Sequence, residues 1–331
     1  MIKIGLLGVG HLGKIHLKLL NEIEAFQLVG FHDPNLDLAK KVSEEKGIPY
    51  FSKIEDLLNE VEAVDIVTPT LVHHSCALQA LELGKHIFIE KPLTNTLSEA
   101  KELLSFSKAH PELKIQVGHV ERFNPAFLSV ADRKLDPMFI EGHRLALYNP
   151  RGTDVSVVLD LMIHDLDIIL SLVKHPVRSV SASGVAVISE SPDIANARIE
   201  FENGCVANLT ASRISVKNLR RLRFFQKDTY LAVDFLEKKS EIFKLSDSEK
   251  DVPEGIHPIR MDSGKDTRYL YFEKPEIHPV NAIRMELEEF AAAIGKDAPI
   301  RVSLEDGYRN LALAHQILQE IEALAGRVDI P

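Results

Sequence analysis

The sequence predicts an α/β protein of two domains, the first built on a parallel sheet and the second on a large, mostly antiparallel open sheet. Three observations predict this architecture. A chain of 331 residues is longer than one hydrophobic core usually supports. Strand and helix patterns alternate through residues 1–121, whereas residues 177–245 have the pattern of short strands separated by turns. We therefore expect one domain at residues 1–121 and another at residues 122–331.

In the first domain, the predicted strands are continuous apolar runs and the segments between them are amphipathic. Such alternation is typical of a parallel sheet with helices on both faces, because each parallel connection has to cross the sheet. We expect strands at residues 2–7, 26–31, 63–68, 86–90 and 114–119, with a short segment near residue 50. We expect helices after residue 13 and at residues 36–46, 54–60, 71–83 and 97–109.

The second domain begins with helical patterns and continues with strands. We expect a helix at residues 125–133, a strand at 138–147 and a strongly apolar helical run at 154–173. After the short strands, residues 246–280 are expected to form a long excursion with a strand near 269–272, and amphipathic helices at 281–294 and 304–324 close the chain. Helices can cover one face of the open sheet, and we expect a second subunit to cover the other.

A glycine-rich turn, GVGHLG, follows the first predicted strand and opens a helix. It places Gly8, Gly10 and Gly13 at the G-x-G-x-x-G spacing. In this setting the first glycine permits a tight turn, the second lets the backbone approach a pyrophosphate, and the third lets helix and strand pack closely. The helix amino terminus, at His11 and Leu12, offers N–H groups and a partial positive charge to the phosphates. The pattern predicts a dinucleotide site.

An acidic residue, Asp33, follows the second predicted strand and lies 20 residues after Gly13. A carboxylate at this distance accepts hydrogen bonds from the adenosine ribose and repels a 2′-phosphate. The next residues, PNLD, offer no arginine to reverse that preference. We therefore expect NAD as the cofactor, with NADP disfavoured.

Two further motifs follow predicted strands, at the sheet edge where open α/β sheets bind ligands. In TPTLVHH, a prolyl turn would place Thr68, Pro69 and His73 beside the dinucleotide; alternatively, the histidine is a polar residue in the first turn of a helix. In EKPL, Glu90 and Lys91 follow an apolar strand. A partly buried lysine there can donate to a substrate hydroxyl or take part in proton transfer. The alternative is a solvated lysine at a strand end.

The motif LDLMIHDLD places Asp160, His164 and Asp167 at positions i, i+4 and i+7, so that they share one face of a helix. Apolar residues occupy most of the remaining positions, and we expect the helix to be buried nearly all round. Burial of a charge without a partner or a function is costly. The motif therefore predicts either a site of chemistry or a core hydrogen-bond network around the histidine.

Composition and charge narrow the classes of function. The net charge is −10, from 39 basic and 49 acidic side chains, and no long basic run occurs, which disfavours nucleic acid and anionic membranes as partners. Charged residues and a histidine interrupt the longest apolar stretch, residues 155–173, which argues against a membrane span. Cys76 and Cys205 cannot form a disulfide framework, so we expect a cytoplasmic protein. His73, His74 and Cys76 have no second cluster at ligand spacing, and we expect no metal.

Taken together, these motifs resemble the Gfo/Idh/MocA family of NAD(P)-dependent oxidoreductases over essentially the whole chain. The residues that carry the resemblance are GVGHLG at 8–13, HDP at 32–34, TPTLVH at 68–73, EKPL at 90–93, ERFNPA at 121–126, DLMIHDLD at 160–167 and SLEDGYRNLALA at 303–314. The resemblance implies a Rossmann domain followed by an α/β domain whose open sheet commonly forms homodimer or homotetramer contacts. It also implies a cis peptide before Pro92.

By position, the catalytic residues of the family fall on Lys91, Asp160 and His164. The resemblance implies oxidation of a secondary hydroxyl of a sugar by hydride transfer to nicotinamide. His164 can then accept the hydroxyl proton near neutral pH, and Asp160 can orient the imidazole or bind a neighbouring hydroxyl. Lys91 can hold the reacting oxygen and stabilise developing alkoxide charge. Many members carry glycine where this chain has Met162, which would narrow the space around the substrate.

The segments VGHVERFNPA and LDLMIHDLD are most similar to those of members that act on nucleotide sugars. They imply a substrate such as UDP-N-acetylglucosamine, oxidised at C3. Arg122, Asn124 and Arg151 are then candidates for contacts to the phosphates or the sugar, and for each arginine the alternative is a surface ion pair. Two other functions stay open: dehydrogenation of a free polyol or other pyranoside, and non-catalytic regulation through NAD binding. Retention of the three catalytic residues favours an enzyme.

Overall fold

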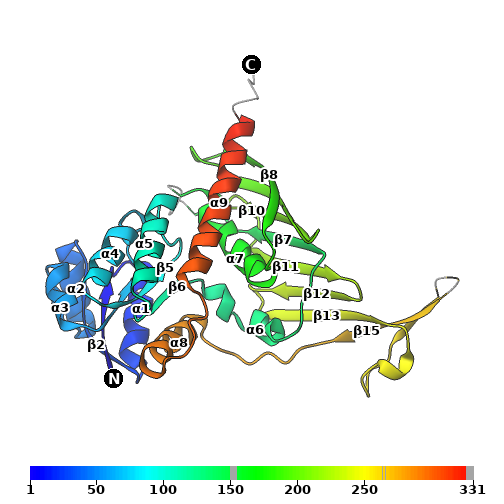
Figure 1. Cartoon of the computed structure of the whole chain (residues 1–331), viewed down its shortest axis with the longest axis horizontal. Helices are drawn as coiled ribbons and strands as arrows, with labels where there is room; N and C mark the ends of the chain where they lie inside the picture. The colour runs from blue at the N-terminus through cyan, green and yellow to red at the C-terminus, as the bar shows by residue number, and fades with distance from the viewer. Residues whose placement is uncertain (150–154, 263, 265, 326–331) are drawn as a thin grey trace. The chain divides into compact units, whose positions relative to one another are not determined.

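The computed structural model describes residues 1–149, 155–262, 264 and 266–325. Within these residues the chain folds as two compact units (Figure 1). Unit 1 consists of residues 1–123 and 281–312, and unit 2 of residues 124–280 together with the chain from residue 313 onward. The predicted division, 1–121 followed by 122–331, did not foresee that the chain returns to unit 1 after residue 280.

The described part of unit 1 contains a six-stranded parallel sheet in the order β3-β2-β1-β4-β5-β6. Its strands are β1 (Ile2–Leu7), β2 (Phe26–His32), β3 (Tyr50–Phe51), β4 (Ala63–Ile66), β5 (His86–Glu90) and β6 (Ile115–Gly118). Every residue of β4 and β6 is buried, as expected for strands covered on both faces. The Rossmann architecture predicted for this part of the chain is confirmed.

Some of the helices between these strands begin or end at local sequence signals. They are α1 (His11–Glu22), α2 (Leu36–Lys46), α3 (Ile54–Glu60), α4 (His73–Glu82) and α5 (Leu97–Ala109), with single turns η1 (Thr70–Val72) and η2 (Val120–Phe123). Asn35 caps α2 by accepting a hydrogen bond from the Leu38 N–H, and Gly47 ends the helix in the left-handed conformation. Thr96 and Glu99 form a capping box at the start of α5. These signals explain why the predicted bounds of α2 and α5 agree with the structure.

Helix α8 (Ala282–Lys296) brings the chain back to unit 1. Its apolar residues Leu287 and Phe290 belong to the same buried cluster as Ile4 and Leu6 of strand β1. The Phe290 ring meets the ring of Phe88 edge to face, with centroids 6.0 Å apart. An amphipathic pattern identifies α8 as a helix that packs on a core, but that pattern does not say on which core, because apolar burial is not directional.

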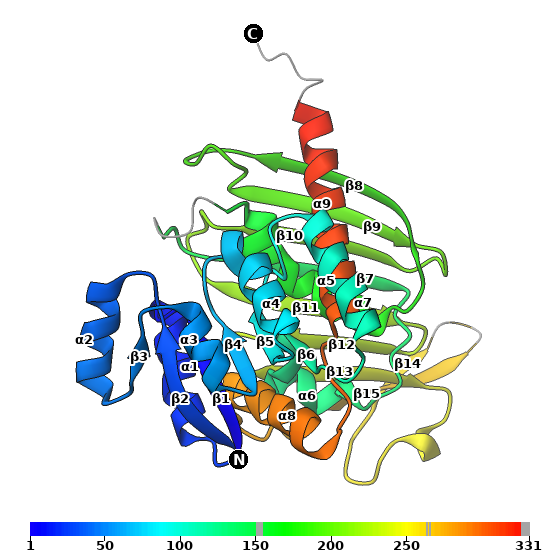
Figure 2. The same ribbon diagram turned by 60° about the vertical axis from the view of Figure 1, so that its left-hand side comes forward.

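The described part of unit 2 contains a nine-stranded sheet in the order β14-β15-β13-β12-β11-β7-β10-β9-β8 (Figure 2). Its strands are β7 (Phe139–Leu145), β8 (Val177–Val185), β9 (Ile194–Phe201), β10 (Val206–Ser212), β11 (Leu219–Gln226), β12 (Thr229–Asp234), β13 (Lys239–Ser246), β14 (Ile259–Asp262) and β15 (Thr267–Glu273). The pairing of β7 with β10 is parallel, and the other pairings are antiparallel. The large, mostly antiparallel sheet is confirmed.

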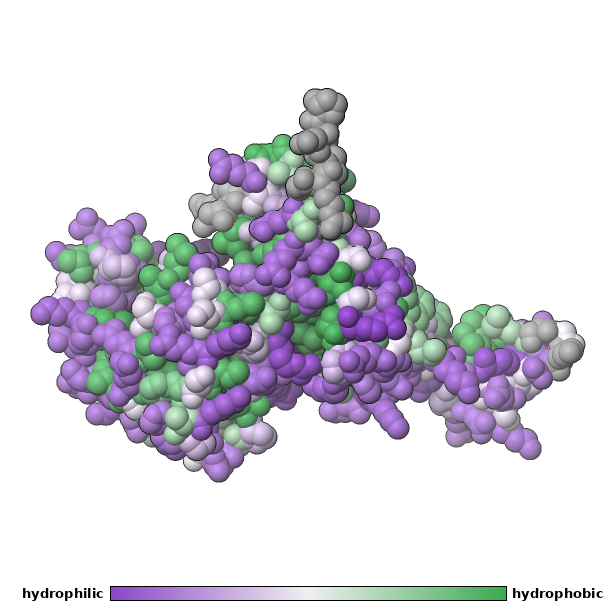
Figure 3. Space-filling model, turned by 45° about the horizontal axis from the view of Figure 1, so that its top comes forward, coloured by the Kyte–Doolittle hydropathy of each residue, from purple (hydrophilic) through white to green (hydrophobic). Residues whose placement is uncertain are grey.

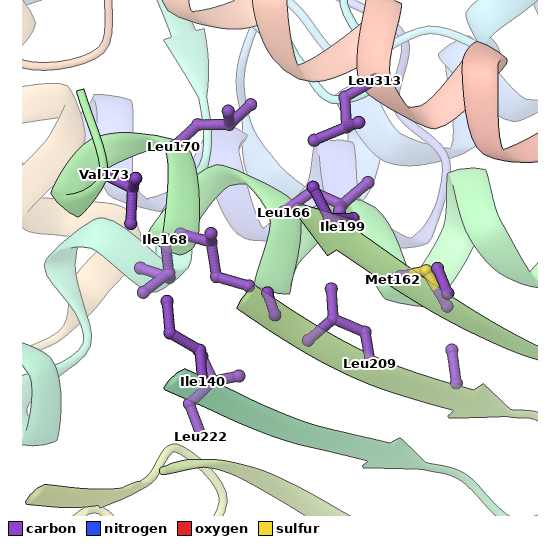
Figure 4. Close-up of a cluster of buried hydrophobic side chains, with 14 of the residues drawn as sticks. Ile140, Met162, Leu166, Ile168, Leu170, Val173, Ile199, Leu209, Leu222 and Leu313 are labelled. Atoms are coloured by element: carbon purple, nitrogen blue, oxygen red, sulfur yellow. The ribbon is translucent and has the colours of Figure 1, made fainter. Parts of the chain in front are cut away.

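One face of this sheet packs on helices. The apolar core combines side chains of α6 (Pro125–Ala131), α7 (Ile163–Leu172) and the second half of α9 (Leu304–Ala325) with alternate residues of the strands. Figure 4 shows Leu166 and Ile168 of α7 with Ile199 and Leu209 of the sheet in this core. Helix α7 is buried nearly all round, as predicted.

The predicted helical run at 154–173 contains a break. Residues Val158–Met162 form a π-helical turn, η3, in which the Ile163 N–H bonds back to the Val158 carbonyl, and regular α-helix follows only from Ile163. A π turn changes the angular step between residues. The prediction that Asp160 and His164 share a face at α-helical spacing was therefore based on a periodicity that this segment does not keep.

The opposite face of the sheet carries an aromatic ladder. Phe139, Phe225, Tyr230, Phe243 and Phe272 lie on neighbouring strands in direct cross-strand register. Successive rings have centroids 5.9, 5.0, 5.5 and 4.9 Å apart. All five are partly exposed, whereas their sequence neighbours Ile140, Phe224 and Ile242 are buried in the core.

Elsewhere the surface is mixed. The face drawn in Figure 3 is mainly hydrophilic, with separate apolar areas. Among the described residues, no helix has the length and hydropathy that a membrane crossing requires. Apolar side chains that are exposed singly are ordinary on proteins and need no special account.

Candidate functional site

A pocket of about 660 Å³ lies at the carboxyl ends of strands β1, β2, β4 and β5 in unit 1. This is the edge at which open parallel sheets bind nucleotides. Of the residues predicted to bind the cofactor, all except His73 line it: Gly8, Gly10, His11, Leu12, Gly13, Asp33, Thr68, Pro69, Glu90 and Lys91. Residues of α4 that were not predicted to bind the cofactor complete the wall, namely Ser75, Cys76 and Gln79.

The three glycines of the fingerprint are required for three different reasons. Gly8 has a φ of +92°, and a Cβ atom on it would lie 2.7 Å from the Val67 carbonyl oxygen. A Cβ atom on Gly13 would lie 2.1 Å from the Gly8 oxygen, so helix α1 and the turn could not keep their contact. A Cβ atom on Gly10 would meet nothing within 4 Å in the part of the chain that the structure describes. The space above Gly10 is therefore part of the pocket, which fits the close approach of a pyrophosphate.

Helix α1 points its amino terminus into this pocket. The helix begins at His11, its first turn contains no acidic side chain, and no side chain of the described residues caps it at Gly10. First-turn N–H groups and the helix dipole favour an anion at such a terminus. The chemistry of the lining therefore fits the phosphates of a dinucleotide.

Asp33 is fixed by two backbone hydrogen bonds. Its Oδ2 accepts from the Val9 N–H and its Oδ1 from the Asn35 N–H, each at 2.9 Å. The side chain is largely buried, so the carboxylate is held rigidly at the edge of the pocket. A fixed anion here suits the two hydroxyls of a ribose and opposes a phosphate on it.

His73 is the first residue of helix α4, in agreement with the alternative of a polar residue in the first turn of a helix. Its ring is buried, with Nδ1 2.9 Å from the Pro92 carbonyl oxygen and Nε2 2.9 Å from that of Thr68. Burial lowers the pKa of His73, which favours the neutral ring with a single N–H to donate. The imidazole lies between the two loops and donates to one of the two carbonyls, and so the residue supports the pocket without lining it. The neighbouring His74 lies 3.0 Å from Glu102.

Glu90 and Lys91 lie at the end of strand β5, and the Lys91–Pro92 peptide is cis. The Lys91 N–H donates to Glu90 Oε2 at 3.1 Å. The Glu90 carboxylate occupies space that a side chain at position 118 would fill, because a Cβ atom on Gly118 would lie 2.9 Å from Glu90 Oε1. The cis peptide implied by the family resemblance is thus present.

The sequence did not reveal that Glu90 faces other ionisable groups inside unit 1. His16 of α1 lies between Asp65 of β4 and Glu90, and Glu286 of α8 is fully buried nearby. One signal was available: an aspartate inside the otherwise apolar strand AVDI is unusual, because a buried carboxylate needs a partner.

In unit 2, Asp160 lies on the π turn η3 and His164 in the first turn of α7, and both side chains are half-buried. A buried ion pair holds this helix to the sheet. Arg144 of β7 donates to Asp165 Oδ1 from Nε at 3.0 Å and from a terminal nitrogen at 2.7 Å. Asp167 is buried as well. The sequence missed the role of Arg144, because the two partners are 21 residues apart.

The candidate substrate residues have structural contacts of their own. Arg122 is largely buried in η2, with its guanidinium 3.8 Å from Asp306. Asn124 caps helix α6: its Oδ1 accepts from the Ala126 N–H, and its Nδ2 donates to the Phe235 carbonyl at 3.0 Å. Asn124 was predicted to contact substrate, but both ends of its amide are used by the fold. Arg151 lies outside the described residues.

No group of three histidine, cysteine, aspartate or glutamate side chains in the described ranges could hold a metal ion. Cys76 and Cys205 are both free, and burial raises the pKa of each thiol, that of Cys205 to about 11. A thiol with a raised pKa is a poor nucleophile.

Comparison with known proteins agrees with this geometry. Residues 2–119 match the family described as "Oxidoreductase family, NAD-binding Rossmann fold" (GFO_IDH_MocA), and residues 138–228 match the "GFO/IDH/MocA C-terminal domain". The chain is 36% identical over 327 residues to the UDP-N-acetylglucosamine 3-dehydrogenase of Acidithiobacillus ferrooxidans, covering 98% of this chain and 99% of that protein.

A solved structure of the UDP-N-acetylglucosamine 3-dehydrogenase of that organism matches with a TM-score of 0.86 and 34% identity, covering 97% of this chain and 98% of the other. The scyllo-inositol 2-dehydrogenase (NAD(+)) of Bacillus subtilis is 32% identical over 234 residues, covering 65% of this chain and 68% of that protein.

Proposed function

Because the chain belongs to the Gfo/Idh/MocA family of NAD-dependent oxidoreductases, we propose that it oxidises UDP-N-acetylglucosamine at the C3 hydroxyl. The observation that carries this proposal is the similarity to a 3-dehydrogenase of that nucleotide sugar over nearly the full length of both chains. A pocket built for a dinucleotide and the retained Lys91, Asp160 and His164 support it.

We propose the following roles for these residues. The pocket of unit 1 would hold NAD, whose nicotinamide would supply the acceptor for the hydride of the carbinol carbon. His164 accepts the hydroxyl proton as general base, since an imidazole has a pKa suited to proton transfer near neutral pH. Asp160 orients the imidazole. The Lys91 ammonium donates a hydrogen bond to the reacting oxygen and stabilises its developing negative charge, so that the carbonyl forms as hydride and proton leave.

The proposal is tested by incubating the purified protein with NAD and a panel of UDP-sugars and free polyols, and following NADH absorbance. We expect turnover of UDP-N-acetylglucosamine, with the 3-keto product identified by mass spectrometry after reduction with borodeuteride. Tight NAD binding without turnover of any sugar would overturn the substrate assignment.

A second candidate is the oxidation of a free polyol. The similarity to an inositol dehydrogenase favours it, although that similarity covers about two thirds of each chain. The same panel separates the two candidates, because a polyol lacks the diphosphate. We propose that Arg122 and Arg151 contact that diphosphate; Arg122→Gln should then raise the KM for the nucleotide sugar and leave the KM of any polyol unchanged.

We propose that Asp33 selects NAD over NADP. Its rigid carboxylate would repel a 2′-phosphate. Asp33→Ser should lower the ratio of NADP to NAD dissociation constants roughly tenfold, the size of one modest electrostatic interaction. An unchanged ratio in the folded variant would contradict the assignment.

We also propose that the open face of the sheet in unit 2 binds a second copy of this chain. The ladder of five aromatic side chains offers apolar area, and the ion pairs Arg223–Glu141 and Arg221–Glu241 on the same strands give both signs of charge to a self-complementary surface. Sedimentation of the wild type and of Tyr230→Glu tests this: the wild type should be a dimer or tetramer and the variant a smaller species.

A location in the cytoplasm also stays a prediction, supported by the two free cysteines.

A further inference from the structure

Four ionisable side chains inside unit 1 interact electrostatically. His16 Nδ1 lies 2.8 Å from Asp65 Oδ2, and His16 Nε2 lies 3.3 Å from Glu90 Oε1. Both carboxyl oxygens of Glu286 are buried without a hydrogen-bond partner among the described residues, although Gln116 donates to the backbone carbonyl of that residue at 2.8 Å. We call His16, Asp65, Glu90 and Glu286 the buried cluster.

The charges in the buried cluster depend on one another. Burial lowers the pKa of His16, but Asp65 and Glu90 outweigh that effect and raise the pKa well above the ordinary value, so the imidazole is cationic. Burial raises the pKa of Glu90, but His16 and Lys91 outweigh it and lower the pKa, so this carboxylate is ionised. Burial and the Glu90 carboxylate raise the pKa of Glu286 well above its usual range. Glu286 therefore keeps a proton that an exposed glutamate would lose.

Glu90 connects the buried cluster to the cofactor pocket, because its carboxylate belongs to the first and lines the second. It lies at the end of β5, whereas Asp33 follows β2, with strands β1 and β4 between them. Asp33 marks the side of the pocket suited to the adenosine ribose. The Glu90 side is therefore suited to the nicotinamide half of a dinucleotide.

We propose that Glu90, which lines the cofactor pocket and lies 3.3 Å from His16, determines the preference of this enzyme for oxidised over reduced cofactor. The proposal rests on the NAD-dependent function given above. An oxidised nicotinamide ring carries a positive charge and a reduced ring carries none, so a carboxylate at this side of the pocket stabilises the oxidised form selectively. The interaction is weakly screened, because Glu90 is only 7% exposed.

The proposal also predicts how pH changes the affinity for NAD⁺ and for NADH. Loss of a proton from His16 or Glu286 makes the buried cluster more negative, so NAD⁺ should bind more tightly as the pH rises, and NADH should not. The other ionisable groups that face Glu90 are Lys91, next to it in sequence, Asp65 of β4 and His73 of α4. Burial lowers the pKa of His73, so that ring contributes no charge near neutral pH.

The experiment measures dissociation constants of NAD⁺ and NADH by calorimetry, with no sugar present. Glu90→Gln should raise the dissociation constant of NAD⁺ about tenfold, which corresponds to about 1.4 kcal/mol of binding free energy. The dissociation constant of NADH should change much less. The matched control is Glu288→Gln, which removes an exposed carboxylate from the helix that carries Glu286 and should change neither constant. A folded Glu90→Gln variant in which both constants change in parallel would overturn the proposal.

A second measurement needs no variant of Glu90. In the wild type, the dissociation constant of NAD⁺ should fall as the pH rises, whereas that of NADH should not change with pH. In the double variant His16→Gln/Glu286→Gln, the two dissociation constants should show the same dependence on pH. Equal pH dependence for both cofactors in the wild type would overturn the proposal. Because no sugar is present, these binding measurements stay valid even if the enzyme does not oxidise UDP-N-acetylglucosamine. If the enzyme does oxidise that sugar but Glu90→Gln leaves the ratio of the NAD⁺ and NADH dissociation constants unchanged, only the present inference is overturned.

Discussion

The two units provide their functional residues in different ways. In unit 1 the pocket is formed largely by main chain: three glycines, the amino terminus of α1 and backbone hydrogen bonds that fix Asp33. In unit 2 the candidate catalytic groups Asp160 and His164 are side chains of the π turn η3 and of helix α7, and a buried ion pair between Arg144 of the sheet and Asp165 holds that helix. A pocket formed by main chain should be sensitive to added atoms. A site formed by side chains should be sensitive to their removal.

The largest expected effect is the loss of the proposed base in unit 2. His164→Ala should lower kcat by about 10²–10⁴, the usual contribution of general base catalysis, and should leave the NAD dissociation constant unchanged. His175→Ala, which removes an exposed histidine shortly after the same helix, is the control and should retain full activity. If His164→Ala retained normal turnover, the proton-transfer role would be wrong.

The next effect concerns the pair that holds α7. Asp165→Ala leaves the Arg144 guanidinium buried without its carboxylate, and the free energy of unfolding should fall by about 3–5 kcal/mol. Glu200→Gln breaks an ion pair with Arg178, whose side chain is 63% exposed, and should cost less than about 1 kcal/mol. Urea denaturation of both variants compares them. Similar losses would show that burial is not what makes the first pair important.

Substitutions of two glycines in unit 1 distinguish a glycine that is needed for packing from one that is needed for the approach of the ligand. Gly13→Ala should lower the free energy of unfolding by about 1–3 kcal/mol, because the added methyl would meet the Gly8 carbonyl. Gly10→Ala should leave stability nearly unchanged, since the added methyl meets no atom of the described residues, and should still weaken NAD binding. Thermal unfolding with and without NAD checks both. Normal NAD affinity in Gly10→Ala would mean that the pyrophosphate does not pass there.

The last effect depends on pH. The folded-state pKa of Glu286 is raised, so the stability contributed by its protonated form is fully present below the ordinary carboxyl pKa of about 4.3 and is lost as the pH rises through the folded-state pKa. Glu286→Gln cannot ionise, so its free energy of unfolding should not fall in this way as the pH rises. The variant should match the wild type near about pH 4 and exceed it at neutral pH, by about 1.4 kcal/mol for each pH unit that separates the folded-state pKa from the ordinary one. If the free energies of unfolding of the variant and the wild type differed by the same amount at every pH in this range, Glu286 would not be a buried neutral acid.

The parts of the molecule that the sequence predicted well are those fixed by neighbouring residues. Helix α2 begins at an asparagine cap and ends at a left-handed glycine, and each signal acts within four residues. The glycine fingerprint and Asp33 belong to one strand–turn–helix–strand unit, so their spacing alone predicted the pocket that they line.

The contacts that the sequence did not reveal join distant segments. The ring of His73 lies 2.9 Å from the carbonyl oxygen of Pro92, 19 residues away. Asn124 caps α6 and also donates to the carbonyl of Phe235, 111 residues away, whereas its contact with substrate stays a prediction. The π turn at Val158–Met162 interrupts a helical pattern that looks continuous in sequence. In each case a partner far along the chain, or a local departure from regular geometry, overrides the pattern.

The sequence by itself determined that this chain has a dinucleotide pocket at the edge of a parallel sheet, because glycine spacing, apolar periodicity and one acidic residue act locally and do not depend on the rest of the fold. Only the tertiary structure decided that α8 completes unit 1 and places Glu286 near His16, Asp65 and Glu90. Apolar burial has no direction, so a sequence cannot say which core a helix will join. A charge, by contrast, takes its ionisation state from its neighbours, and those neighbours exist only once the chain has folded.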